Sequence, residues 1–220
     1  MWRNSAGDLA HAVYRASTWT GDTIEASVDV GTDPTLAISA AGMLHVLFHD
    51  TSTGSLRVAS RDASGGTWTF ETIEMGATAG RWAAATTDAS GALFVAYQRG
   101  REDDLYFARK ISGAWMTERI DDAGNTGYHP QIALAADGTF HVVYYLLATL
   151  SDGELRYATG APGAWHVSTL DPEFSTGAGN VSLALDPAGV PHAVYRAGAE
   201  LRHAWSNGDG IDQDCDGSDG

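Results

Sequence analysis

Apolar and polar positions in the stretch 81–127 form four short runs separated by turn residues. Small apolar residues occupy 83–85, an alternating run covers 93–97, and a third run covers 105–108. A fourth run closes at Ile120 and is followed by a Gly-containing loop. Period-two alternation with β-branched and aromatic residues is typical of strands. This stretch therefore predicts a sheet of four strands.

The same pattern recurs along the chain. A Trp follows the tight turn before the fourth run at Trp19, Trp68, Trp115 and Trp165, at intervals of 47 to 50 residues. A Leu opens the third run at Leu9, Leu56, Leu105, Leu155 and Leu201, and an Ala follows each one three residues later. A turn Gly recurs at Gly42, Gly91, Gly138 and Gly189. Tandem repeats of about 50 residues with four strands each are typical of a β-propeller.

The phase of the repeats predicts three complete four-stranded blades and a partial blade at each end. The complete blades cover 32–80, 81–127 and 128–177, and the partial ones cover 1–31 and 178–206. The partial blade 1–31 begins within a repeat, because Trp2 matches the residue that ends the second strand in the other repeats. Both partial blades supply a third strand, so we expect an arc of a larger ring or an imperfectly closed ring. Opening inside a repeat also favours a chain cut from a longer exported protein.

Composition narrows the choice of partners. The net charge of -15 argues against nucleic acid or an anionic membrane as partner, because both require a basic surface. No run approaches the roughly 20 apolar residues of a membrane-spanning helix. Cys215 is the single cysteine, which excludes a disulfide within the chain.

His45, His141 and His192 occupy one repeat position and could suggest a metal site. They belong to different blades, however, and metal ligands must converge on one point. We therefore expect them to form hydrogen bonds within or between blades. The repeated Trp residues are expected to pack the outer hairpin of each blade.

The turn before each Trp resembles the Asp box of sialidases, S-x-D-x-G-x-T-W. The residues that carry this match are Ser60, Arg61, Asp62, Gly66, Thr67 and Trp68, with one extra residue between the halves. The chain is also similar to tandem repeats of secreted bacterial proteins, through the segments 129–134 and 186–195. These resemblances imply a sialidase-like propeller at the cell surface or outside the cell. They do not specify a function, because propellers host many.

Propeller ligands usually meet the face where first strands begin and second strands end. First-strand starts carry Asp33, Arg81, Trp82, Tyr128, His129 and Asn180, and second-strand ends carry His49, Arg99, Tyr145 and Arg196. Aromatic and polar side chains of this kind suit the binding of a sugar or a peptide. Resemblance to sialidases would also require a Tyr–Glu nucleophile pair, and the repeat alignment places none at this mouth.

Segment 207–220 is rich in Asp and Gly and cannot bury a core. It resembles the D-G-x-D-x-D-C-D-G metal-binding motif of bacterial surface proteins and the Asp-rich calcium repeats of thrombospondin type 3. The candidate ligands are Asn207, Asp209, Asp212, Asp214 and Asp216. Alternating carboxylates suit Ca²⁺, which takes six to eight oxygen ligands. A softer ion such as copper, bound through Cys215, and a plain acidic linker are the alternatives.

The sequence thus favours a non-catalytic extracellular or cell-surface recognition and adhesion module that binds glycan or protein. A truncated glycoside hydrolase of the sialidase type is the second hypothesis. A structural spacer tethered by calcium is the third.

Overall fold

The computed structural model describes residues 2–3, 8–26, 30–76, 79–100, 102–148, 152–175, 181–198, 200–206 and 211–212, all of them in strands or their connections. The first sheet contains β1 (Trp2–Arg3), β2 (Leu9–Arg15) and β3 (Thr18–Glu25). The second contains β4 (Val30–Ile38), β5 (Met43–Asp50), β6 (Ser55–Asp62) and β7 (Thr69–Glu74).

Three further sheets follow in the same pattern. The third contains β8 (Ala79–Thr87), β9 (Leu93–Arg99), β10 (Asp104–Ile111) and β11 (Ala114–Asp121). The fourth contains β12 (Tyr128–Leu134), β13 (Phe140–Leu147), β14 (Asp152–Ala161) and β15 (Ala164–Ser175). The fifth contains β16 (Val181–Leu185), β17 (Pro191–Ala197), β18 (Glu200–Ser206) and β19 (Ile211–Asp212).

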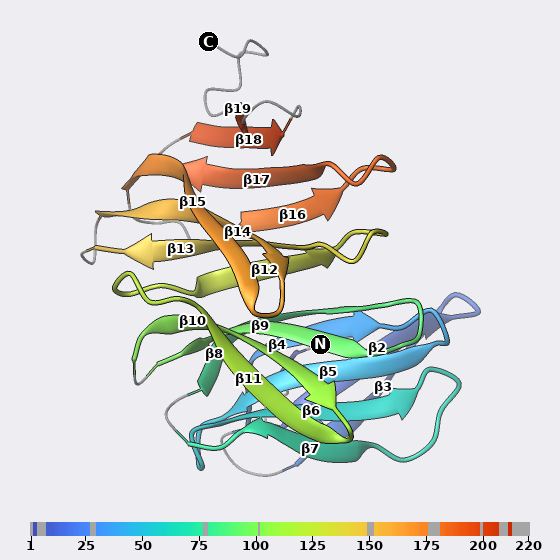
Figure 1. Cartoon of the computed structure of the whole chain (residues 1–220). Coiled ribbons are helices and arrows are strands. Elements are labelled where there is room, and N and C mark those ends of the chain that lie inside the picture. The colour runs from blue at the N-terminus through green and yellow to red at the C-terminus, as the bar shows by residue number, and fades with distance from the viewer. Residues whose placement is uncertain are drawn as a thin grey trace.

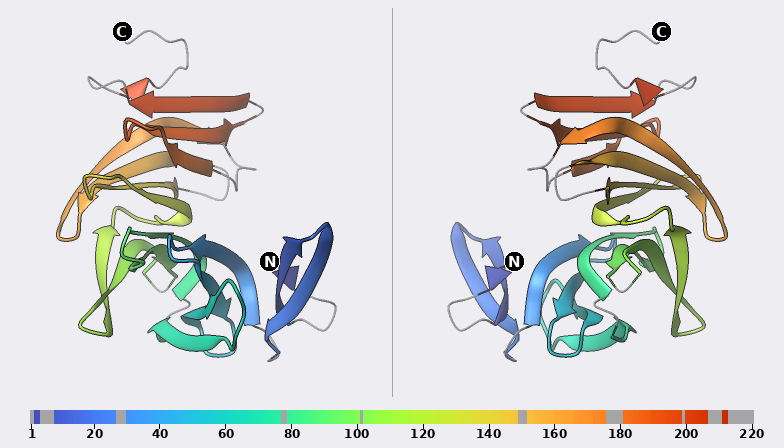
Figure 2. Two further views of the ribbon diagram at one scale, coloured as in Figure 1. Left: turned by 90° about the vertical axis from the view of Figure 1, so that its right-hand side faces the viewer. Right: turned by 90° about the vertical axis from the view of Figure 1, so that its left-hand side faces the viewer.

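Each sheet is an antiparallel meander, with its strands paired in chain order (Figure 1). The strands β4, β8, β12 and β16 contact one another in chain order and form the inner edge of the array. Figure 2 shows the sheets fanned around this inner edge, with the first and last sheets at opposite ends of the series. The prediction of an all-β propeller is confirmed. The four turn glycines have φ between 85° and 91°, a region that suits Gly in a tight turn.

The last blade differs from the sequence prediction. Residues 178–206 were expected to lack a fourth strand, but Ile211 and Asp212 pair with Ser206 and Trp205 and supply one. The structure therefore has four four-stranded sheets rather than three. A strand of two residues is too short to show an alternation of apolar and polar positions. The Asp-rich sequence around it predicted a tail instead. At the other end, Trp2 pairs with Ala10 just as Tyr97 pairs with Tyr106, in agreement with the expected phase.

Contacts between neighbouring sheets repeat with the sequence. Leu9, Leu56, Leu105 and Leu155 are all fully buried, and each packs on the second strand of the following sheet. Leu105, for example, clusters with Val142 and Tyr144. Leu201 holds the same position in the last sheet and is 79% exposed. The repeated Leu is therefore a junction residue, and it is buried only where another sheet follows.

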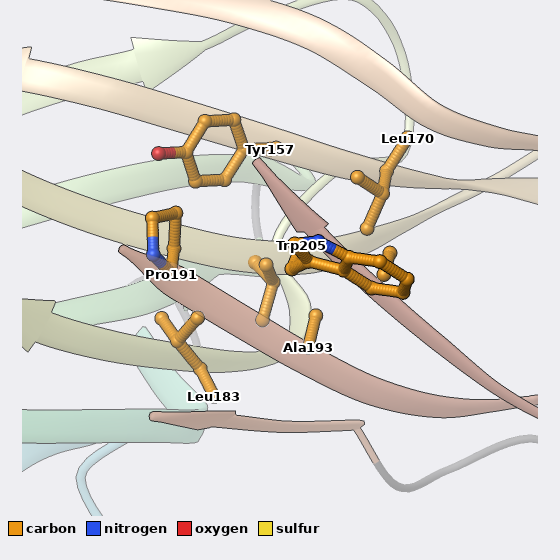
Figure 3. Close-up of a pocket in the computed structure, with 8 residues that line it drawn as sticks. Tyr157, Leu170, Leu183, Pro191, Ala193 and Trp205 are labelled. Carbon is orange, nitrogen blue, oxygen red and sulfur yellow. The ribbon is translucent and has the colours of Figure 1, made fainter. Parts of the chain in front are cut away.

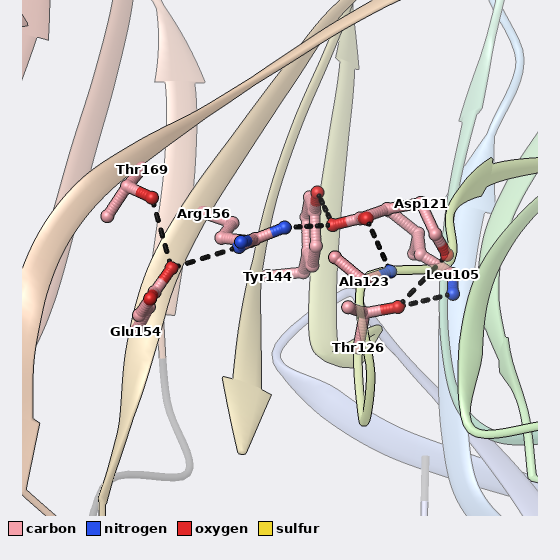
Figure 4. A network of polar contacts seen from close by, with 8 residues as sticks. All are labelled: Leu105, Asp121, Ala123, Thr126, Tyr144, Glu154, Arg156 and Thr169. Carbon is pink, nitrogen blue, oxygen red and sulfur yellow. Dashed lines mark hydrogen bonds and ion pairs between the residues drawn. The ribbon is translucent and has the colours of Figure 1, made fainter. Parts of the chain in front are cut away.

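A carboxylate in the last strand of each of the first four sheets forms an ion pair with an Arg of the next sheet. The pairs are Glu25 with Arg57 (3.9 Å), Glu74 with Arg99, Asp121 with Arg156 (2.9 Å) and Asp171 with Arg202 (2.8 Å). Figure 4 shows Asp121, whose carboxylate also accepts hydrogen bonds from the Tyr144 hydroxyl (2.7 Å) and the Ala123 amide (3.0 Å). Burial is the main cause that raises the pKa of Tyr144, with the Asp121 charge adding to it.

The repeated Trp forms a third junction contact. The indole N–H donates to an acidic side chain of the preceding sheet, from Trp68 to Asp22 (3.0 Å), Trp115 to Glu71 (3.1 Å) and Trp165 to Glu118 (2.7 Å). Each acceptor stands three residues after the Trp of its own sheet. Trp19, in the first sheet, is 69% exposed. The Trp residues lie in outer hairpins, as predicted, and they also join neighbouring blades.

Candidate functional site

The start of each inner strand is interrupted by a β-bulge. The pairing with the second strand skips residues between Thr32 and Thr35 in β4, between Ala79 and Ala83 in β8, and between Tyr128 and Gln131 in β12. A bulge redirects side chains away from the regular alternation of a strand. Asp33, Trp82 and His129 stand at the same repeat position within these three bulges. The irregularity therefore brings one side chain from each blade to the same end of the inner edge.

These three side chains line one hollow of about 210 Å³, which we call the axial hollow. Its lining residues come from the four inner strands and comprise Asp33, Pro34, Thr35, Trp82, Ala83, His129, Pro130, Gln131 and Val181. Pockets that take drug-sized ligands are larger, about 300–1,000 Å³. The axial hollow is thus of a size for a single small group, such as one sugar ring.

An aromatic cluster forms one wall of the axial hollow. The ring centroid of Trp82 lies 4.7 Å from that of Tyr128 and 5.0 Å from that of His129. The Arg81 guanidinium lies 5.5 Å from the Trp82 ring, although Arg81 does not line the hollow. Trp82, Tyr128 and His129 are each half-buried. Packing on both neighbours fixes the Trp82 indole and leaves part of it available to a ligand.

The charge of the hollow depends on Asp33 and His129. Burial lowers the pKa of the His129 imidazole, and the nearby Asp33 charge opposes that shift without reversing it. His129 is therefore neutral at pH 7, with one nitrogen able to donate and the other able to accept a hydrogen bond. Asp33 is exposed and is the one acidic residue in the described lining.

The predicted residues at the second-strand ends do not line the axial hollow. His49 and Tyr145 are buried, and the Nδ1 of His49 lies 2.7 Å from the Ala79 carbonyl oxygen. Arg99 is held in its ion pair with Glu74 and lies over the Tyr106 ring. Arg196 is exposed and donates from Nε to the Gly198 carbonyl (2.8 Å). Asn180 lies outside the described residues. Among the candidates that the structure describes, Asp33, Trp82 and His129 line the axial hollow.

A second recess lies between the last two sheets and is lined by apolar side chains, among them Tyr157, Leu170, Leu183, Pro191 and Trp205 (Figure 3). Its volume of about 10 Å³ leaves room for about one water molecule. Its lining is almost entirely apolar, and its volume is too small for a ligand larger than water. This recess is a packing gap rather than a binding site.

The repeated His residues form hydrogen bonds inside their own sheets. His45 Nδ1 lies 2.9 Å from Ser60 Oγ, and His141 Nδ1 lies 2.5 Å from Tyr157 Oη. His192 Nδ1 lies 3.0 Å from His203 Nε2, and the two rings stack. These contacts agree with the structural role expected from the sequence.

The predicted metal ligands fall almost entirely outside the described part of the chain. Asn207, Asp209, Asp214 and Asp216 lie there, and Asp212 stands in β19 opposite Trp205. Within the described ranges, no group of three His, Cys, Asp or Glu side chains could hold a metal ion. In the same ranges no helix is long and apolar enough to span a membrane.

Comparison with known proteins identifies the fold. No model of a protein family and no curated protein matches the chain. Among solved structures, AofleA from Arthrobotrys oligospora superposes with a TM-score of 0.68 at 14% identity, covering 92% of this chain and 62% of its own. A PL25 ulvan lyase bound to -[GlcA(1-4)Rha3S]- gives 0.62 at 13% identity, covering 95% and 66%.

The intramolecular trans-sialidase from Ruminococcus gnavus, in complex with oseltamivir carboxylate, gives a TM-score of 0.53 at 18% identity, covering 83% of this chain and 44% of its own. The chain thus spans less than two thirds of the length of AofleA and of the trans-sialidase. At these identities the likeness concerns the fold and not the activity. The chain has a β-propeller fold of the kind found in sialidases and polysaccharide lyases.

Proposed function

We propose that this protein is a non-catalytic glycan-binding propeller and that the axial hollow is its binding site. The observation that carries the proposal is the convergence of Asp33, Trp82 and His129 from three blades into one hollow with an aromatic wall. A sugar ring presents an apolar face that packs on an indole, and its hydroxyls need donors and acceptors at the ring edge. Asp33, His129 and Gln131 provide these groups.

The similar solved structures support a glycan as ligand class. They include a lyase bound to a saccharide and a trans-sialidase. A net charge of -15 continues to disfavour nucleic acid. We further propose an extracellular or cell-surface location, on the strength of the resemblance to repeats of secreted proteins. The Asp-rich segment 207–220 is proposed to bind Ca²⁺.

A sialidase-like hydrolase is the second candidate, supported by the fold alone. Such an enzyme holds the substrate carboxylate with arginines, and the described lining of the axial hollow contains no Arg. Release of the fluorophore from a fluorogenic sialoside would favour this candidate over the non-catalytic one. We expect no release above the buffer control.

The first prediction concerns Trp82. Replacement by Ala removes the aromatic wall, and aromatic packing contributes about 0.5–1.5 kcal/mol beyond buried area. We therefore expect Trp82→Ala to weaken glycan binding about tenfold, measured by calorimetry with the best ligand from a glycan array. Trp19→Ala is the matched control, because Trp19 is 69% exposed and lies in the first sheet, away from the hollow.

Trp82→Phe keeps an aromatic ring and should restore part of the affinity. Thermal unfolding of each variant checks that the blades remain folded. Equal affinity of the Trp82→Ala and Trp19→Ala proteins would remove the axial hollow as the binding site. Absence of any glycan ligand on the array would remove the glycan-binding function itself.

A further inference from the structure

We propose that the axial hollow selects amino sugars, with Asp33 receiving the ammonium group of the ligand. This inference rests on the proposed glycan-binding function and specifies the chemical class of its ligand. The class is a hexosamine whose nitrogen carries no acetyl group and is therefore cationic near neutral pH.

Asp33 differs from the carboxylates at the junctions between sheets in having no ion-pair partner in the described part of the chain. Each junction carboxylate, such as Asp121 or Asp171, forms an ion pair with an Arg of the next sheet. Asp33 forms no ion pair within the described part of the chain, and no Lys or Arg is among the described lining residues. Its charge is therefore not neutralised by a described side chain, so a cationic ligand group could supply the missing counter-charge.

The backbone holds the Asp33 carboxylate at the hollow. Asp33 adopts φ of 47°, in the left-handed region that Asp tolerates better than most residues. Pro34 follows it and restricts the chain on its other side, and both residues line the hollow. The backbone that carries the carboxylate is thus fixed by the fold before a ligand arrives, and this lowers the entropic cost of binding.

His129 does not supply a compensating positive charge. Burial keeps its imidazole neutral at pH 7, as described above. The axial hollow is consequently negative, and the chain as a whole carries a charge of -15. A field of this sign attracts a cationic ligand and repels sialylated or sulfated glycans.

Trp82 distinguishes an amino sugar from other cations. An indole face attracts an ammonium group and also packs against the apolar face of a sugar ring. A hexosamine offers both features on one ring, and Asp33 and Trp82 line the same hollow. A lysine side chain offers the charge without the ring, so we expect a basic peptide to bind less tightly.

The test is calorimetric titration of the full 220-residue chain at near-neutral pH and low salt. Four probes are compared: a β-1,4-linked glucosamine tetramer, its fully N-acetylated counterpart, 3′-sialyllactose and tetralysine. We expect the glucosamine tetramer to bind at least about tenfold more tightly than each of the other three. N-acetylation changes the charge of the nitrogen and leaves the sugar ring in place, so this pair isolates the charge.

Asp33→Asn provides the matched variant. Asn fits the left-handed backbone and keeps the shape of the side chain while removing its charge. We expect it to reduce binding of the glucosamine tetramer about tenfold and to reduce binding of the N-acetylated tetramer distinctly less, because Asn keeps an oxygen that accepts hydrogen bonds from sugar hydroxyls. Asp137→Asn removes the same charge from an exposed turn and should change neither.

The outcomes separate this inference from the proposed function. Equal affinity for the two tetramers, or tighter binding of the N-acetylated one, would overturn the charge selectivity while leaving glycan binding intact. Tetralysine binding as tightly as the glucosamine tetramer, through Asp33, would show that the hollow recognises a cation without a sugar. Failure of every saccharide to bind would overturn the proposed function as well.

Discussion

Asp33 and His129 show how much single residues of the site could be predicted. The repeat alignment placed them at the start of their inner strands, and the structure places both in the axial hollow with φ of 47°. The bulge that brings them to the hollow cannot be recognised from the sequence of a single repeat. Arg99 was assigned to the same mouth, but its partner Glu74 comes from the preceding blade. A contact between distant parts of the chain could not be read from position in the repeat.

At the residue scale, we predict that binding weakens as the pH falls. The charge that acts on the His129 imidazole comes from Asp33 on β4. Because the pKa of His129 lies below its ordinary value of about 6.5, its imidazole becomes cationic only in acid. That charge would then compete with the ligand ammonium for Asp33.

The amines of the glucosamine tetramer become more fully protonated in acid, but its affinity should nevertheless decline as the pH falls below the ordinary imidazole pKa of about 6.5. His129→Gln removes the titrating imidazole and should abolish this decline. A series of titrations over pH measures both curves. Identical curves for the two proteins would exclude His129 as the group responsible.

At the scale of elements, the regular strands were predictable and the junctions were not. Period-two alternation located the strands, and the turn glycines located the first tight turn of each blade. The indole-to-carboxylate contacts, such as Trp68 to Asp22, join different repeats and have no periodic signal within one. The strand Ile211–Asp212 was missed because it pairs through two residues only.

We predict that identical substitutions at one repeat position have different effects. Leu105 is fully buried between two sheets, so Leu105→Ala should lower the free energy of unfolding by about 2–5 kcal/mol. Leu201 is 79% exposed, so Leu201→Ala should change it by no more than about 0.5 kcal/mol.

Urea unfolding followed by fluorescence measures both changes under the same conditions. Comparable losses for the two variants would mean that Leu201 is covered in solution, contrary to the exposed last sheet. Because the sheets form a linear series, loss of cooperativity in the Leu105 variant would itself report a broken junction.

At the scale of the whole molecule, the fold could be predicted because each blade is one continuous repeat of the sequence. Tandem repeats of about 50 residues with four strands each are typical of a propeller. The ion pairs between sheets, including Asp121 with Arg156, link successive repeats into one array. Removing one partner of such a buried pair leaves an uncompensated charge. The metal ion proposed for segment 207–220 could not be inferred from the fold, because four of its five candidate ligands lie beyond the described strands.

We predict that Ca²⁺ binds segment 207–220, which also supplies the short strand β19 of the last blade. Asp209, Asp212, Asp214 and Asp216 repel one another, and a divalent cation would relieve that repulsion. Calorimetric titration with calcium should give binding heat for the full chain and none for a chain ending at Ser206. Equal heats would exclude the segment as the site, and copper binding lost in Cys215→Ser would assign a softer ion.

A crystal structure of the complex with the glucosamine tetramer would show whether a glycan binds where three blades meet. We expect one sugar ring packed on Trp82 in the axial hollow, with its nitrogen within hydrogen-bonding distance of the Asp33 carboxylate. A saccharide seated between two blades at a junction such as Asp121 and Arg156, with the axial hollow empty, would contradict this expectation.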